Sequence, residues 1–92
     1  MIESFRHKGL RQLFEHDNPR GVNPEHVAKL KVILTVMNTA GEIGDIDIAT
    51  FRLHPLTGNL KGFWSVTVRA SWRVIFRFES GKASDVDLVD YH

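Results

Sequence analysis

The stretch that most constrains the fold is residues 62–78, with the sequence GFWSVTVRASWRVIFRF. Apolar and polar residues alternate along two segments that flank Ala70 and Ser71. This period of two is typical of strands that have one buried face and one solvated face. The sequence therefore predicts an antiparallel hairpin.

The register of this hairpin follows from keeping its apolar faces together. A two-residue turn at residues 70–71 would place Arg73 and Arg77 on the core side. A three-residue connection at residues 70–72 instead forms three apolar pairs: Val68 with Val74, Val66 with Phe76 and Trp64 with Phe78. Because a one-residue slip turns a whole strand face over, we predict the three-residue connection. It also places Arg69 directly beside Arg73 on the solvated face.

Two arginines side by side on a sheet repel each other, so an anion is expected between them. Carboxylates from a neighbouring strand would meet this need, and so would a phosphate group. The chain has a net charge of only +1, but Arg52 to Phe78 contains five Lys and Arg residues and no Asp or Glu. A local concentration of positive charge of this kind raises the potential at one surface.

Helical signals lie before the hairpin. We predict a short opening strand at residues 1–5, a helix at residues 7–16, and a second helix from Asn23 and Pro24 to about Asn38, since these residues suit a helix start. Its apolar stripe consists of Val27, Leu30, Ile33, Leu34 and Met37. Val32 and Val36 lie off this stripe; the first helix is expected to cover them, and an exposed patch for a partner is the alternative.

The remaining elements are strands. A short strand is predicted at residues 51–53, ended by His54 and Pro55, and a last strand at residues 83–91. The order βααβββ predicts one α+β domain over residues 1–92, with two N-terminal helices packed on one face of a small, mainly antiparallel sheet.

The last strand is expected to pair with the second hairpin strand. Joining Phe76 to Val86 and Val74 to Leu88 keeps the apolar faces together. The same register sets Asp85 opposite Arg77 and Val89 opposite Arg73. The solvated face would then hold residues whose side chains can take part in a reaction: Arg69, Arg73, Arg77 and Tyr91, with His54 and His92 nearby.

These residue types suit cleavage of RNA by attack of a 2′-hydroxyl on the adjacent phosphate. A base must take the hydroxyl proton, an acid must protonate the leaving oxygen, and cations must offset the charge of the transition state. Histidine performs either proton transfer near neutral pH, and arginine binds phosphate through two N–H groups. His7, His16 and His26 are predicted to be solvated helix positions. Both tryptophans are predicted to belong to the core.

Several classes of protein are disfavoured. The chain has no cysteine, which excludes disulfides and thiolate metal sites. No apolar run reaches the ~20 residues of a membrane span, and the N-terminus lacks the pattern of a signal peptide. We therefore expect a cytoplasmic protein.

The WSVTVRASWRVIFRF hairpin, the upstream His-Pro-Leu segment, and the Asp-Tyr-His C-terminus together resemble HigB-type toxins of the RelE/ParE superfamily. The resemblance extends over nearly the whole chain. It implies a RelE-like microbial ribonuclease toxin fold and a ribosome-dependent mRNA interferase that cleaves mRNA in the A site and so inhibits translation and growth. It implies no metal ion or other cofactor. The implied partners are the 70S ribosome, mRNA and a HigA-type helix-turn-helix antitoxin, with operator DNA reached only through the antitoxin and no membrane.

The resemblance also implies functional residues. The implied catalytic set is His54, Arg69, Arg73, Asp90, Tyr91 and His92. Within it, we expect His54 or Tyr91 to be the base and His92 or Asp90 to be the acid, and the sequence leaves both choices open. The residues expected to contact RNA or the ribosome are Lys8, Arg11, Arg20, Lys29, Lys31, Lys61 and Arg77. Thr57 stands where related toxins commonly have lysine, and Lys61 in the same loop is a candidate replacement. Phe63 stands where relatives often have tyrosine.

Two other functions remain open from the sequence. One is a ParE-like toxin that poisons gyrase and is not a nuclease. The other is a plain binding module for RNA or protein, in which Arg69 and Arg73 only dock a ligand.

Overall fold

The computed structural model describes residues 1–91. Its helices and strands are α1 (Lys8–His16), α2 (Val27–Thr39), β1 (His54–Pro55), β2 (Trp64–Arg69), β3 (Trp72–Glu79) and β4 (Lys82–Asp90). Five 3₁₀ turns lie between them: η1 (Pro19–Gly21), η2 (Pro24–His26), η3 (Ile43–Ile46), η4 (Ala49–Phe51) and η5 (Gly58–Leu60). Both predicted helices are confirmed to within a few residues.

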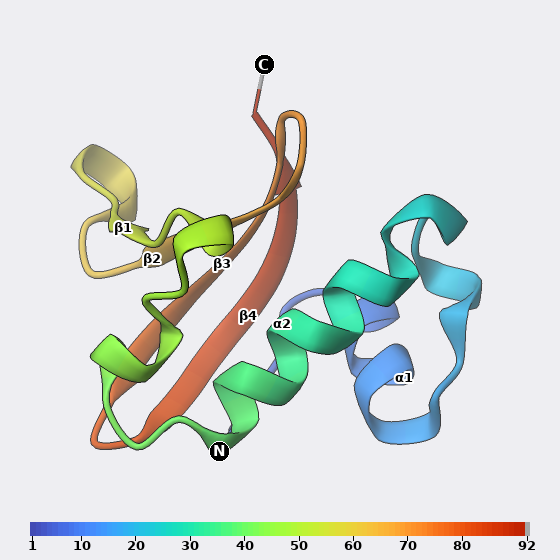
Figure 1. Cartoon of the computed structure of the whole chain (residues 1–92), viewed down its shortest axis with the longest axis horizontal. Coiled ribbons are helices and arrows are strands. Elements are labelled where there is room, and N and C mark those ends of the chain that lie inside the picture. Colours follow the sequence, from blue (N-terminus) through green and yellow to red (C-terminus); the bar gives the residue numbers. More distant parts are fainter. Residues whose placement is uncertain (92) are drawn as a thin grey trace.

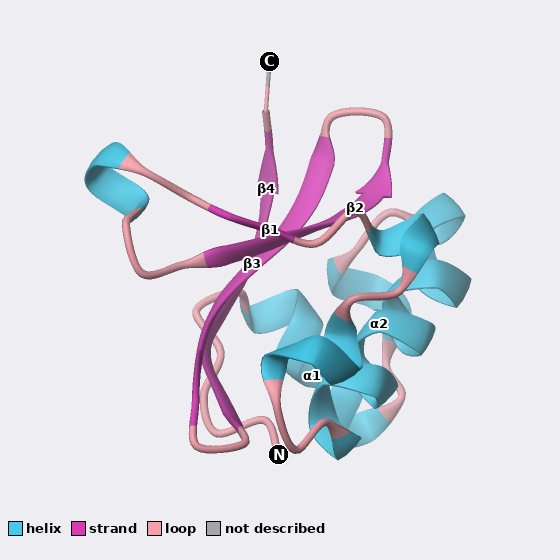
Figure 2. Ribbon diagram, turned by 60° about the vertical axis from the view of Figure 1, so that its left-hand side comes forward, coloured by secondary structure: helices cyan, strands magenta, loops and turns pink. Residues whose placement is uncertain are grey.

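The four strands form an antiparallel sheet in the order β1-β2-β3-β4. Both long helices lie on the same side of this sheet (Figures 1 and 2). The predicted α+β class is thereby confirmed. The predicted opening strand is reduced to two isolated parallel bridges, in which Ile2 pairs with Ala83 and Phe5 with Val86 on β4. The predicted strand at residues 51–53 is wrong, because η4 ends at Phe51 and the strand is His54–Pro55 itself.

Packing between the helices and one sheet face forms the core. The predicted stripe of α2 is buried at Leu30, Ile33, Leu34 and Met37, and Val27 is half-buried beside it. Val36 packs against this core, whereas Val32 remains 53% exposed, so the expected cover by α1 is wrong for Val32. The sheet contributes residues from β2, β3 and β4: Val66, Val68, Val74, Phe76 and Val86.

The hairpin register differs from the predicted one. Trp64 lies opposite Phe76 and Val66 opposite Val74, and the register shifts between Thr67 and Arg69. The chain thus makes the two-residue turn at residues 70–71 and inserts Val68 as an extra residue in β2. A β-bulge of this kind lets a strand keep its apolar face on the core while the turn stays short. The prediction failed because periodicity alone does not reveal an inserted residue.

The pairing of β3 with β4 is confirmed near the C-terminus, where Arg73 lies opposite Val89 and Val74 opposite Leu88. Beyond Ile75 the register shifts, so Arg77 lies opposite Ser84 and not Asp85. Asp85 has a left-handed backbone, with φ of 52°. Its carboxylate still reaches Arg77, with 3.5 Å between Asp85 Oδ2 and Arg77 Nε.

No helix in the described part of the chain is long and apolar enough to cross a membrane.

Candidate active site on the outer face of the sheet

The sheet has a helix-side face and an opposite face, here called the outer face. The strand registers place His54, Ser65 and Ile75 in one row across the outer face. The next row contains Thr67, Arg73 and Val89. Because side chains alternate along strands, His54 and Arg73 share the outer face.

Arg69 does not share this face, and the predicted placement of Arg69 beside Arg73 is wrong. The bulge at Val68 sets Arg69 opposite Trp72, which packs against the core on the helix-side face, as Val74 does. Arg69 Nη1 donates to Glu25 Oε2 at 3.0 Å, and Glu25 belongs to η2 on the helix side. The expected repulsion between two neighbouring arginines is therefore absent, and a carboxylate is the anion that Arg69 meets.

Arg73 is half-buried and folds back on its own turn. Its Nη1 donates to the carbonyl oxygen of Ala70 at 2.5 Å and to that of Trp72 at 3.0 Å. Within residues 1–91 no ion pair joins Arg73 to a carboxylate. Its positive charge is therefore not neutralised by the part of the chain that the structure describes.

His54 is exposed, and one of its ring nitrogens has a defined partner. His54 Nδ1 lies 3.1 Å from the carbonyl oxygen of Arg52. A carbonyl oxygen only accepts hydrogen bonds, so Nδ1 bears the proton in this contact. In the neutral ring Nε2 is then left as a proton acceptor. Arg52 has a left-handed backbone, with φ of 52°, in the turn that directs this carbonyl at His54.

The C-terminal residues are fastened to the β2–β3 turn. Tyr91 N donates to the carbonyl oxygen of Ser71 at 2.9 Å, and Ser71 Oγ donates to Asp90 Oδ1. The end of the chain and this turn lie at the same end of the sheet in Figure 1. Tyr91 is 39% exposed and directly follows the end of β4 at Asp90, which lies opposite Trp72, the neighbour of Arg73 in β3. His92, the remaining predicted catalytic residue, lies outside the described residues.

Sequence reasoning missed the residues that hold this region together. Ser71 was considered only as part of the two-residue turn that the sequence analysis rejected. A polar residue is nevertheless typical of such a turn and could have indicated it. Glu25 belonged to the predicted second helix, and no partner was predicted for its carboxylate. His26 was predicted to be solvated but is 3% exposed, with its ring centroid 5.4 Å from that of Trp72. This contact is invisible in sequence because it joins a 3₁₀ turn to a distant strand.

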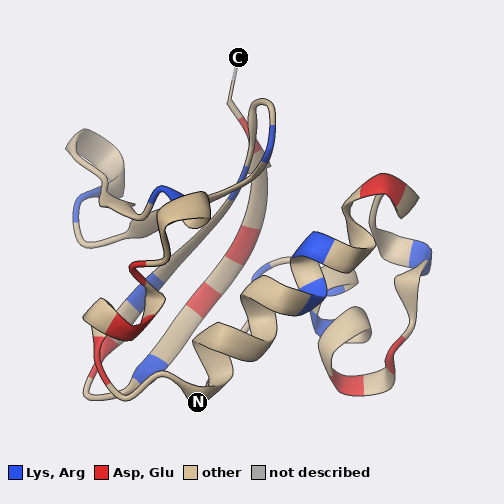
Figure 3. Cartoon of the chain, viewed as in Figure 1, with Lys and Arg blue, Asp and Glu red and all other residues tan. Residues whose placement is uncertain are grey.

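The cations predicted to bind RNA differ in their surroundings. Arg77 pairs with Asp85 and lies over the ring of Phe63, with 4.5 Å from Cζ to the centroid. Lys31 pairs with Asp17 at 2.7 Å, and Lys29 lies over the ring of Phe51. Exposed side chains without an ion pair in the described part of the chain are Lys8, Arg11, Arg20 and Lys61. Figure 3 shows that basic residues lie on both the helical layer and the hairpin.

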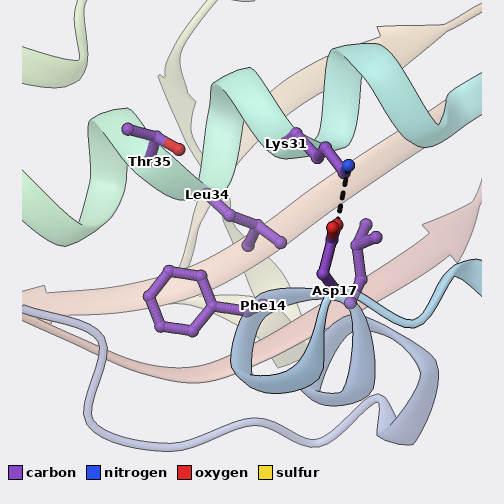
Figure 4. Close-up of a pocket in the computed structure, with 6 residues that line it drawn as sticks. Phe14, Asp17, Lys31, Leu34 and Thr35 are labelled. Carbon is purple, nitrogen blue, oxygen red and sulfur yellow. Dashed lines mark ion pairs between the residues drawn. The ribbon is translucent and has the colours of Figure 1, made fainter.

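A groove of about 280 Å³ lies between α1 and α2 (Figure 4). Its lining combines apolar side chains with one ion pair: Leu13, Phe14, Asp17, Lys31, Leu34 and Thr35. None of the predicted catalytic residues lines it. The candidate active site thus lies on the outer face of the sheet and not in this groove.

Solved structures with the same arrangement define the class of protein. YafQ from E. coli strain BL21(DE3) matches with a TM-score of 0.63 and 18% identity, over 98% of this chain and 91% of that chain. A chain of the YoeB-YefM complex from Staphylococcus aureus matches with a TM-score of 0.59 and 16% identity, over 100% and 95%. At these identities the likeness shows the fold alone. The protein is a small α+β protein of the fold that these structures share.

The family follows from the sequence comparisons. The family model described as RelE-like toxin of type II toxin-antitoxin system HigB matches residues 3–92, and the chain belongs to this family. It is 45% identical over the full length of both chains to "Endoribonuclease HigB" of Proteus vulgaris. It is 32% identical to "Toxin HigB-1" of Vibrio cholerae serotype O1 over 85 residues, 90% of each chain. The resemblance stated from the hairpin and the C-terminus is confirmed.

Proposed function

We propose that this protein is the toxin of a type II toxin-antitoxin system and an endoribonuclease that cleaves mRNA in the ribosomal A site. Family membership and the named endoribonuclease activity of the Proteus vulgaris relative support the reaction class. The observation that supports the site is that His54 and Arg73 share the outer face, that the exposed Tyr91 is bound through its N–H to the Ser71 carbonyl in the turn before Arg73, and that no carboxylate of residues 1–91 pairs with Arg73.

The reaction begins when the 2′-hydroxyl of the substrate attacks the adjacent phosphorus atom. His54 Nε2 takes the hydroxyl proton, because the contact of Nδ1 with the Arg52 carbonyl leaves Nε2 free to accept it. A general base of this kind contributes roughly 10²–10⁴ in rate. The sequence left His54 and Tyr91 as alternative bases, and the defined tautomer favours His54.

Arg73 binds the scissile phosphate and offsets the charge that develops on it. Its Nη1 binds the carbonyls of the turn, and the other N–H groups of the guanidinium bind phosphate oxygens through stronger, charge-assisted hydrogen bonds. Arg69 is bound by Glu25 on the other side of the sheet, so we assign it no contact with the reacting phosphate.

The leaving 5′-oxygen needs a proton donor, and the C-terminal residues supply the candidates. Tyr91 is exposed directly after the end of β4, while Asp90 is bound by Ser71 Oγ at the edge of the sheet. We propose Tyr91 as the donor, with Asp90 ordering the C-terminus. The predicted role of His92 in this step stays a proposal that rests on the family resemblance.

Binding to the ribosome is proposed to use the exposed cations of the helical layer. Lys8, Arg11 and Arg20 are suited to phosphate contacts because no described carboxylate pairs with them. Lys29 and Lys31 join them only by giving up Phe51 and Asp17. Such contacts are independent of sequence and weaken as salt rises. Lys61 is proposed to replace the lysine missing at Thr57. A helix-turn-helix antitoxin and a cytoplasmic location complete the proposal.

The test replaces Arg73 by Ala and measures cleavage of mRNA on purified ribosomes. We expect a loss of about 10²–10³ in the cleavage rate, as when one donor to a developing oxyanion is removed. Lys82→Ala removes the same charge at the far end of β4 and should leave cleavage unchanged. Full activity of folded Arg73→Ala would refute the proposed site.

The same experiment separates the other functions. A gyrase-poisoning toxin would arrest growth while transcripts stay intact and DNA damage signalling rises. A plain binding module would cause neither cleavage nor growth arrest. Mapping of transcript ends after induction of the toxin, together with growth and DNA damage signalling in the same cells, distinguishes all three outcomes.

A further inference from the structure

We propose that η2 is a clamp that holds the β2–β3 turn in its cleavage-competent position, and that Glu25 and Arg69 are positioning residues of this clamp. The inference rests on the proposed function, because the turn matters only if the residues fastened to it carry out the cleavage.

The turn at Ala70 and Ser71 is the point where three parts of the candidate active site meet. The Ala70 carbonyl binds the Arg73 guanidinium. Ser71 binds the backbone of Tyr91 through its carbonyl and the carboxylate of Asp90 through its hydroxyl. A displacement of this turn therefore moves the arginine and the C-terminus together.

Two contacts from η2 join the flanks of this turn to the helical layer, one on each flank. On the β2 flank, Arg69 Nη1 donates to Glu25 Oε2 at 3.0 Å. On the β3 flank, the ring of Trp72 packs on His26 with 5.4 Å between centroids and an interplanar angle of 60°. Arg69 and Trp72 are also paired with each other, at the last position of the hairpin before the turn.

The clamp itself is locally rigid. Asn23 Oδ1 accepts a hydrogen bond from Glu25 N, and the Asn23 carbonyl accepts one from His26 N, both at 2.9 Å. His26 is 3% exposed, and its Nδ1 has no hydrogen-bond partner among residues 1–91. A buried imidazole with an unpaired nitrogen is costly to keep, so packing on Trp72 and not hydrogen bonding accounts for its place.

The exposure of the Arg69–Glu25 ion pair indicates whether the pair affects the stability of the protein or the geometry of the site. The Arg69 and Glu25 side chains are 62% and 68% exposed, and exposed ion pairs add little to stability. Their effect is expected on geometry, because misplacing a catalytic group by about 1 Å costs up to ~10²-fold in rate. A change in cleavage rate without a change in stability is thus the sign of a clamp.

The test is a charge swap measured by single-turnover cleavage on ribosomes. Glu25→Arg and Arg69→Glu should each lower the maximal rate about 10-fold, with the ribosome concentration at half-maximal rate and the melting temperature unchanged. The double variant Glu25→Arg/Arg69→Glu should recover to within about 3-fold of the original rate, since it restores the pair with reversed charges. Glu15→Arg makes the same charge change on α1 and should have no effect.

The result that would overturn the clamp is a failure of rescue. If Arg69 touches RNA directly, Arg69→Glu stays impaired in the double variant, and Glu25→Arg alone does not lower the rate. Arg73→Ala, measured in parallel, separates this outcome from failure of the proposed site. If Arg73→Ala does not cleave mRNA and the double variant Glu25→Arg/Arg69→Glu is not rescued, only the clamp is rejected. If Arg73→Ala cleaves mRNA normally, the proposed active site is rejected.

Discussion

For the substitution Gly9→Ala in α1, helix propensity and tertiary packing predict changes of opposite sign in the free energy of unfolding. Propensity favours Ala over Gly inside a helix by up to ~1 kcal/mol, so Gly9→Ala would be expected to stabilise the protein. A Cβ at this position, however, would lie 2.3 Å from the carbonyl oxygen of Gly21 and 2.7 Å from its carbonyl carbon. Both atoms belong to the backbone and have no rotamer through which to move away.

The magnitude follows from these distances. Ordinary contacts begin at 3.4 Å, so α1 and η1 must separate by about 1 Å. Overpacking of this kind costs roughly 1–3 kcal/mol, which exceeds the gain in propensity. We expect Gly9→Ala to lower the free energy of unfolding by about 1–2 kcal/mol and the melting temperature by roughly 5–15 °C.

Thermal and urea unfolding followed by circular dichroism measure this effect. Gly41→Ala is the matched control, because the nearest atom to its new Cβ would be Asp45 Oδ2 at 3.7 Å. Its stability should change by less than about 0.5 kcal/mol. A Gly9→Ala protein as stable as the original, or more stable, would show that the close contact of α1 with η1 does not constrain the fold.

Two further predictions concern the site and the surface. His54→Gln should lower the single-turnover cleavage rate by about 10²–10⁴ while the protein stays folded, because it removes the proposed base; His16→Gln, on the exposed side of α1, should cleave normally, and equal activity of both variants would exclude His54 as the base. Asp85→Asn should lower stability by at most about 1 kcal/mol, since Asp85 is 38% exposed while it pairs with Arg6 and Arg77, and the difference should shrink in 1 M salt; a loss that salt does not reduce would show that charge pairing is not the cause.

The predictable part of the fold was the part set by local periodicity. Alternation along residues 62–78 marked β2 and β3, and the helical spacing of Leu30, Ile33 and Met37 marked the buried side of α2. The period of two also assigned Arg73 to the outer face correctly, because the bulge lies at Val68, near the turn. Such patterns are visible because burial of one face repeats along every turn or pleat.

The predicted strand registers failed where one inserted residue changes the face to which the following side chains point. The bulge turns Arg69 towards the helices, and a similar register shift places Arg77 opposite Ser84. Alternation assumes an unbroken pleat, so every residue beyond an irregularity is assigned to the wrong neighbour or the wrong face. The buried position of His26 was missed for a different reason, since its partner Trp72 lies far along the chain.

The sequence by itself determined the class of fold, the family, and a cation-rich hairpin ahead of an Asp-Tyr-His end. Only the tertiary structure decided which cations are neutralised. Glu25 and Arg69 are 44 residues apart in the chain, and Arg73 obtains backbone carbonyls in place of a carboxylate. The physical reason is that secondary structure reflects the residue types along a short segment, whereas the charge left at a surface depends on which distant side chains the packing brings within bonding distance.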